Sequence, residues 1–179
     1  DDFDFPGGTL TPTQLERDRY DLSYAHQGDD SRLLVFAGRL DTRGSGTPAL
    51  PMDIRSIATD LYGTRYTTAL GGSTLDVAAG YSDVDHVMDN FTLRTPPALP
   101  TGYRSTHAVG EGLQWRIGTT TPGEQGEWRF GLDGETAEHS ALITNPNAPP
   151  FFVENFDGAG RDIAGVYGQW NGRHDALDF

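Results

Sequence analysis

Glycine and proline recur at short intervals along the chain, and this punctuation constrains the fold more than any other feature. The segments between them are brief and rich in residues that favour strands. The expected strands are Leu33–Leu40, Ile54–Thr59, Arg65–Leu70, Thr74–Ala79, Val84–Leu93, Tyr103–Val109, Leu113–Ile117, Glu127–Leu132, Ala141–Thr144, Phe151–Phe156 and Ile163–Trp170. So many short strands predict an all-β fold, either a single antiparallel barrel or a sandwich.

Several of these segments alternate between apolar and polar residues. Alternate residues of Leu75–Ala79 are apolar, and so are Trp128, Phe130 and Leu132, which places each set on one face of a strand. One segment has a different pattern: Thr13 precedes Glu16 at the spacing of a helix capping box. It predicts either a helix of about two turns or a turn before a strand.

Three proline-rich segments are expected to be loops, because paired prolines disfavour helix. They are Thr42–Pro51, Arg94–Gly102 and Thr144–Phe151. We expect one all-β domain over residues 1–179, with a subdivision near 94–102 as the alternative.

Composition excludes several classes of function. The net charge of −13 over 179 residues disfavours nucleic-acid binding, which requires clustered positive charge. The absence of cysteine excludes disulfides and thiol nucleophiles. No apolar run approaches the roughly 20 residues of a membrane-spanning helix. A start at Asp1 without methionine suggests a processed product, so we expect an extracellular, periplasmic or cell-surface location.

The stretch DGAGRDIAGVYGQWNG, residues 157–172, is the strongest candidate for a sequence motif. Its first residues resemble one copy of a calcium-binding nonapeptide, with Asp157 and Asp162 as oxygen ligands. One copy supplies too few oxygens, because that motif shares each calcium between stacked turns. We therefore interpret Gly158 and Gly160 as a turn that precedes a strand, and calcium as the alternative.

Other candidate sites are aromatic or acidic. The acids between Glu111 and Glu138 fit no paired-acid spacing, so no catalytic residue is assigned, and a polysaccharide hydrolase or lyase is an alternative function. Exposed aromatic residues beside arginines and acids can bind a glycan or a protein, and Tyr103 or His107 could ligate haem. The candidate ligand-binding residues are Tyr103, His107, Trp115, Trp128, Tyr167 and Trp170.

Segments from Ser73 onward resemble the eight-stranded barrel of bacterial surface lipoproteins of the transferrin-binding protein B type. Ser73–Leu93 is similar to its paired strands, and GEWRFGLDG followed by IAGVYGQWNG is similar to its closing strands. The resemblance implies a surface-exposed, non-enzymatic barrel that captures a host or nutrient ligand such as a protein or haem. It carries over no specific binding residues.

These observations predict an extracytoplasmic, non-enzymatic binding or surface protein with a protein, haem or glycan ligand. A subunit of an extracellular assembly is a further alternative. In that interpretation the alternating ends DDFDF and HDALDF pair with a neighbour's sheet edge.

Overall fold

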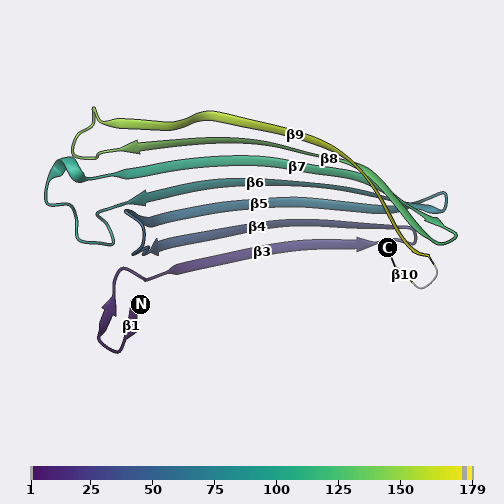
Figure 1. Ribbon diagram of the computed structural model, residues 1–179, viewed down its shortest axis with the longest axis horizontal. Helices are drawn as coiled ribbons and strands as arrows, with labels where there is room; N and C mark the ends of the chain where they lie inside the picture. The colour runs from purple at the N-terminus through teal and green to yellow at the C-terminus, as the bar shows by residue number, and fades with distance from the viewer. Residues whose placement is uncertain (1, 175–176, 179) are drawn as a thin grey trace.

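The computed structural model describes residues 2–174 and 177–178, and nearly all of them lie in long antiparallel strands (Figure 1). The strands are β1 (Phe3–Phe5), β2 (Gly8–Leu10), β3 (Glu16–Gln27), β4 (Ser31–Ser45), β5 (Asp53–Leu70), β6 (Ser73–Asp89), β7 (Ser105–Gly123), β8 (Gly126–Thr144), β9 (Phe152–His174) and β10 (Leu177–Asp178). A single 3-10 turn, η1 (Pro100–Gly102), interrupts the connection between β6 and β7.

Strands β3 to β10 form one sheet in which each strand pairs with the next along the chain. The strands on both sides of the proline-rich segment 94–102 therefore belong to the same sheet. The separate hairpin of β1 and β2 lies beyond the start of β3 (Figure 1). The prediction of an all-β antiparallel fold is confirmed.

The two ends of the sheet differ. At one end, which we call the turn end, strands are joined by the short connections 28–30, 71–72 and 124–125. At the other, the loop end, the longer connections 46–52, 90–104 and 145–151 join them (Figure 1). Gly71 and Gly72 have φ angles of 56° and 87° in the tightest connection, which side chains with a Cβ rarely adopt.

The sheet is a single curved layer (Figure 1). Among the described residues no hydrophobic side chain is buried, whereas many large ones are exposed. A domain of this size normally buries an apolar core. The apolar residues of this sheet are therefore not covered by the other described residues.

The strands are about twice as long as the sequence predicted, because neighbouring expected strands are halves of one strand. Ile54–Thr59 and Arg65–Leu70, for example, both lie in the 18-residue β5. Gly63 lies between them, where a Cβ would come within 2.2 Å of the Phe36 ring. Glycine is thus required there for cross-strand packing rather than for a turn.

Two further expectations are corrected. Glu16 begins β3, so the segment after Thr13 is a turn before a strand and not a helix. Residues 157–172 do not form a hairpin turn: they lie within the continuous β9, where Gly158 has a φ of 58° beside an irregularity in the pairing with β8. No helix in the described part of the chain is long and apolar enough to cross a bilayer.

Candidate functional site

The two faces of the sheet differ in chemistry, because successive side chains of a strand point to opposite faces. On β7, Leu113, Trp115 and Ile117 share one face, while Gln114 and Arg116 lie on the other. Residues directly opposite each other on paired strands share a face, so the pairing extends this assignment across the sheet. We call the two sides the apolar face and the polar face.

The apolar face carries a continuous band toward the turn end, which we call the apolar belt. Its members are Leu22, Tyr24, His26, Leu33, Val35, Ala37, Tyr62, Thr64, Tyr66, Thr68, Leu70, Leu75, Val77, Ala79, Tyr81, Leu113, Trp115, Ile117, Thr119, Trp128, Phe130, Leu132, Gly134, Ala164, Val166, Gly168 and Trp170. None of them is an acid, a lysine or an arginine. The row that contains Leu113 continues through Thr136 on β8 to Asp162 on β9, so on β9 an acid already stands at the border of the belt.

Aromatic side chains border the belt on two sides. Toward the loop end, the Tyr62 and Tyr81 rings are stacked with centroids 6.4 Å apart, and the Tyr81 hydroxyl donates a hydrogen bond of 2.7 Å to Glu111. Toward the turn end, the Trp128 and Trp170 rings lie 6.3 Å apart. Tyrosine and tryptophan favour such borders because one end of each ring system is apolar and the other polar.

A row of charged residues runs directly beyond the Tyr62–Tyr81 border, one residue on each of five neighbouring strands. The row consists of Arg39, Asp60, Asp83, Glu111 and Glu138, each directly opposite the next. On these strands, the apolar face thus changes from uncharged to charged residues between two neighbouring rows, which lie two residues apart along each strand.

The polar face carries charges at the same level as the apolar belt: Arg32, Arg65, Asp76, Arg116, Arg129, Asp133 and Glu135. Arg65 and Asp76 form an ion pair of 2.7 Å. Arg116 donates a 3.0 Å hydrogen bond to the Tyr167 hydroxyl and lies 4.9 Å from that ring's centroid. Arg129 also forms an ion pair with Glu127, and Glu135 forms one with Arg161.

A groove of about 590 Å³ lies on the polar face, lined by Phe36, Gly80, Gly112, Glu135, His86 and His139 among others. His86 lies beyond the charged row, toward the loop end. Its Nε2 atom is buried without a hydrogen-bond partner, and burial lowers the pKa of the imidazole. The neutral form of imidazole, which burial favours here, is the form that binds metal ions.

Both methionines of the chain lie at the loop end of the sheet, Met88 near the end of β6 and Met52 in the 46–52 connection. Met88 follows His86 by two residues and so shares the polar face. Met88 is directly opposite Thr106, whose hydroxyl lies 3.5 Å from the Met52 sulfur. Sequence reasoning sought only His, Asp and Glu partners for His86, and the His-x-Met spacing on one strand face was the signal that it missed.

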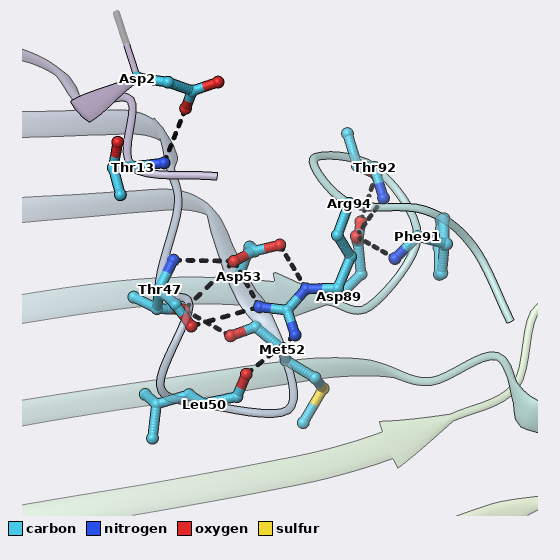
Figure 2. Close-up of polar contacts among 10 residues, drawn as sticks. All are labelled: Asp2, Thr13, Thr47, Leu50, Met52, Asp53, Asp89, Phe91, Thr92 and Arg94. Atoms are coloured by element: carbon cyan, nitrogen blue, oxygen red, sulfur yellow. Dashed lines mark hydrogen bonds and ion pairs between the residues drawn. The ribbon is translucent and has the colours of Figure 1, made fainter. Parts of the chain in front are cut away.

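An ion pair at the loop end joins two connections (Figure 2). Arg94 donates hydrogen bonds of 2.7 and 2.6 Å to the two carboxylate oxygens of Asp53, and others to the Leu50 and Thr47 carbonyls. Asp53 is only 1% exposed, and hydrogen bonding by Arg94 lowers the pKa of its carboxyl. Asp89, directly opposite Asp53, accepts hydrogen bonds from the backbone of Phe91 and Thr92.

The six candidate ligand-binding residues do not come together. Tyr103 lies in the 90–104 connection with its ring 5.2 Å from Phe91, and His107 pairs with Asp85 at 2.9 Å on the apolar face near the loop end. Trp115, Trp128 and Trp170 belong to the apolar belt. Tyr167 lies on the polar face, so the expectation that Tyr167 and Trp170 occupy opposite faces is confirmed.

The acidic candidates are also dispersed. Glu111 and Glu138 lie on the apolar face, whereas Glu135 lies on the polar face. Asp157 and Asp162 both lie in β9. Over residues 2–174 and 177–178, no group of three or more His, Asp or Glu side chains is arranged to hold a metal ion. Calcium and haem binding stay predictions.

The sheet as a whole resembles that of a known protein. The copper transporter OprC is similar to this chain with a TM-score of 0.82 and 19% sequence identity, over 96% of this chain and 29% of that one. No protein-family model and no curated protein matches the sequence. The likeness concerns the fold, and the resemblance to transferrin-binding protein B-like lipoproteins stays a prediction.

Proposed function

We propose that this chain forms part of the wall of a membrane-spanning β-barrel that transports a solute across a bacterial outer membrane. One observation carries the proposal: on β5 to β8 the same strand segments are free of charge on one face and rich in charges on the other. A barrel wall in a bilayer needs this arrangement, because one face meets acyl chains and the other meets water.

The dimensions of the belt support this proposal. On β5 it runs from Tyr62 to Leu70, close to the roughly 9–11 residues of a strand that crosses a bilayer at a tilt. The aromatic borders correspond to the girdles at the two interfaces, and short turns at one end with longer loops at the other are typical of outer-membrane barrels. The loop half of each strand would then stand outside the membrane.

The proposed location agrees with the expected extracytoplasmic location. The proposal is tested by measuring, residue by residue along β7, whether side chains meet lipid or water.

A soft metal ion is the cargo that the polar face fits best, and copper is what the similar transporter carries. Thioether sulfurs select Cu(I), and neutral imidazole is a good copper ligand. Met88, Met52 and His86 supply these groups on the polar face, beyond the charged row and thus on the outer side of the proposed membrane. A copper ion that arrives from outside would therefore reach these three residues before it reaches the polar-face charges at the level of the apolar belt.

Cu(I) titration against a chromogenic competing chelator tests the cargo. We expect His86→Ala and Met88→Ala each to raise the Kd for Cu(I) by more than about tenfold, because loss of a ligand exceeds the roughly 10–100-fold cost of losing a ligand's hydrogen-bond partner. His107→Ala is the matched control, because His107 lies on the opposite face. Equal Kd values for all three variants would exclude this cargo site.

A further inference from the structure

The sheet has two long unpaired edges. Over the described residues, β3 pairs only with β4, and β9 pairs with β8 and, at Arg173–His174 alone, with β10. The apolar belt reaches both edges, where Leu22 is 75% exposed and Val166 is 82% exposed. Because lipid offers no hydrogen bonds to unpaired backbone groups, such edges are not left open in a bilayer.

The directions of the two edge strands, β3 and β9, limit which strands can pair with them in the antiparallel sense. Adjacent strands alternate in direction from β3 to β9, so β3 and β9 run the same way, both toward the turn end (Figure 1). Direct closure of β9 on β3 would therefore pair them in parallel, within one copy or between copies arranged in a ring. Antiparallel pairing of β3 with β3 of a second copy would invert that copy in the membrane.

The short strand β10 supplies the antiparallel alternative. Leu177 pairs with His174, and Asp178 with Arg173, so β10 runs back along β9 in the direction opposite to it. A longer strand that continued β10 in this pairing register would cover the whole β9 edge.

We infer that the wall is completed by an odd number of additional strands, three or more, from the same polypeptide outside these residues, because the sheet is an open curved layer whose edges one strand would not join (Figure 1). The first of them is a continuation of β10 along β9. This inference rests on the proposed function. An odd number makes every contact antiparallel, including the last one with β3. In the strand that extends β10, residues opposite Val166 face lipid and are apolar, and residues opposite Tyr167 face the lumen and are polar.

Two measurements on the full-length protein in lipid vesicles test this inference. The first is hydrogen exchange: amides of β3 and β9 should exchange as slowly as those of the central β6, because covered edges have no free N–H groups. The second is the spin–spin distance between labels at Tyr24→Cys and Ala164→Cys, which lie in one row across the sheet. Six inter-strand spacings of about 4.8 Å predict a separation near, and by curvature somewhat below, roughly 29 Å.

Fast exchange of alternate amides on β9 would overturn the inference, and so would a label separation below about 10 Å, the reach of one or two inter-strand spacings. Mixing copies labelled singly at Tyr24 and at Ala164 tests a second copy as the covering partner, and a short distance in that mixture also overturns it. Oxygen accessibility of the Tyr24 label separately tests the proposed function, because lipid contact at this position does not depend on what covers the edges.

Discussion

Replacing Ile117 by arginine should destabilise the folded protein in lipid by about 2–4 kcal/mol, the cost of a cation near the midplane of the lipid-facing side of a barrel. Ile117 lies within the apolar belt on β7, with belt residues Val77 and Leu132 directly opposite it on β6 and β8. Its side chain has no acid beside it on this face. The free energy of unfolding by urea or guanidinium in lipid vesicles measures the effect.

Gln114→Arg is the matched control, because Gln114 lies on the same strand but faces the polar side, with Glu135 directly opposite. A positive charge there remains in water beside an acid, so we expect a change below about 1 kcal/mol. If Ile117→Arg and Gln114→Arg lowered the free energy of unfolding equally, both faces would meet the same surroundings, which contradicts a wall in a bilayer.

Arg94→Leu should have the second large effect, a loss of about 2–4 kcal/mol. Removing one partner of a buried ion pair costs about 3–5 kcal/mol, and access of water to the Arg94 side reduces this cost. The loss is expected to be local to the 46–52 and 90–104 connections, so hydrogen exchange in these two loops is the measurement. Arg39→Leu is the control. Arg39 pairs with Asp41 and Asp60 on the exposed surface, so its replacement should lower the stability by less than about 1 kcal/mol.

The Arg94 effect should depend on pH in a defined direction. Hydrogen bonding by Arg94 lowers the pKa of Asp53 in the folded protein, so this pair adds stability above the unfolded pKa of about 3.9. That stability is lost as the pH falls through the lowered pKa of the folded state. The difference between the protein and Arg94→Leu should therefore be full at neutral pH and shrink in acid. A difference that is constant down to pH 2 would contradict this account.

The strand content and the alternation could be predicted from sequence because both depend on local periodicity. Trp128, Phe130 and Leu132 were expected on one face, and pairing with β7 and β9 confirms it. Strand length could not be predicted in the same way. Gly63 and Gly134 lie between the expected strands, yet in the sheet each packs against an aromatic ring of a neighbouring strand, Phe36 and Trp115 respectively. Such packing depends on a register that only the folded sheet fixes.

The role of each face could not be predicted, because the alternation of apolar and polar residues does not show whether a face meets a protein core, a ligand, water or lipid. An apolar strand face was expected to pack into a core or to form a ligand-binding face, and Trp115, Trp128 and Trp170 were therefore candidate ligand-binding residues. Only alignment of the strands reveals that the uncharged positions form one belt and that Asp83 and Glu111 lie at its border. His86 and Met88 are separated by a residue of the opposite face, and the contact of Met52 with Thr106, directly opposite Met88, depends on the loop that precedes β5.

The most direct test of the barrel wall is a scan of single spin labels along β7, from Val109 to Ile117, in the full-length protein in lipid vesicles. The chain has no cysteine within these 179 residues, so none has to be removed from this segment before labelling. Collision rates with oxygen report lipid, and those with a water-soluble nickel complex report water. The account predicts oxygen contact at Leu113, Trp115 and Ile117, nickel contact at the residues between them, and nickel contact on both faces at and beyond Glu111. Equal nickel contact on both faces throughout the scan would contradict it.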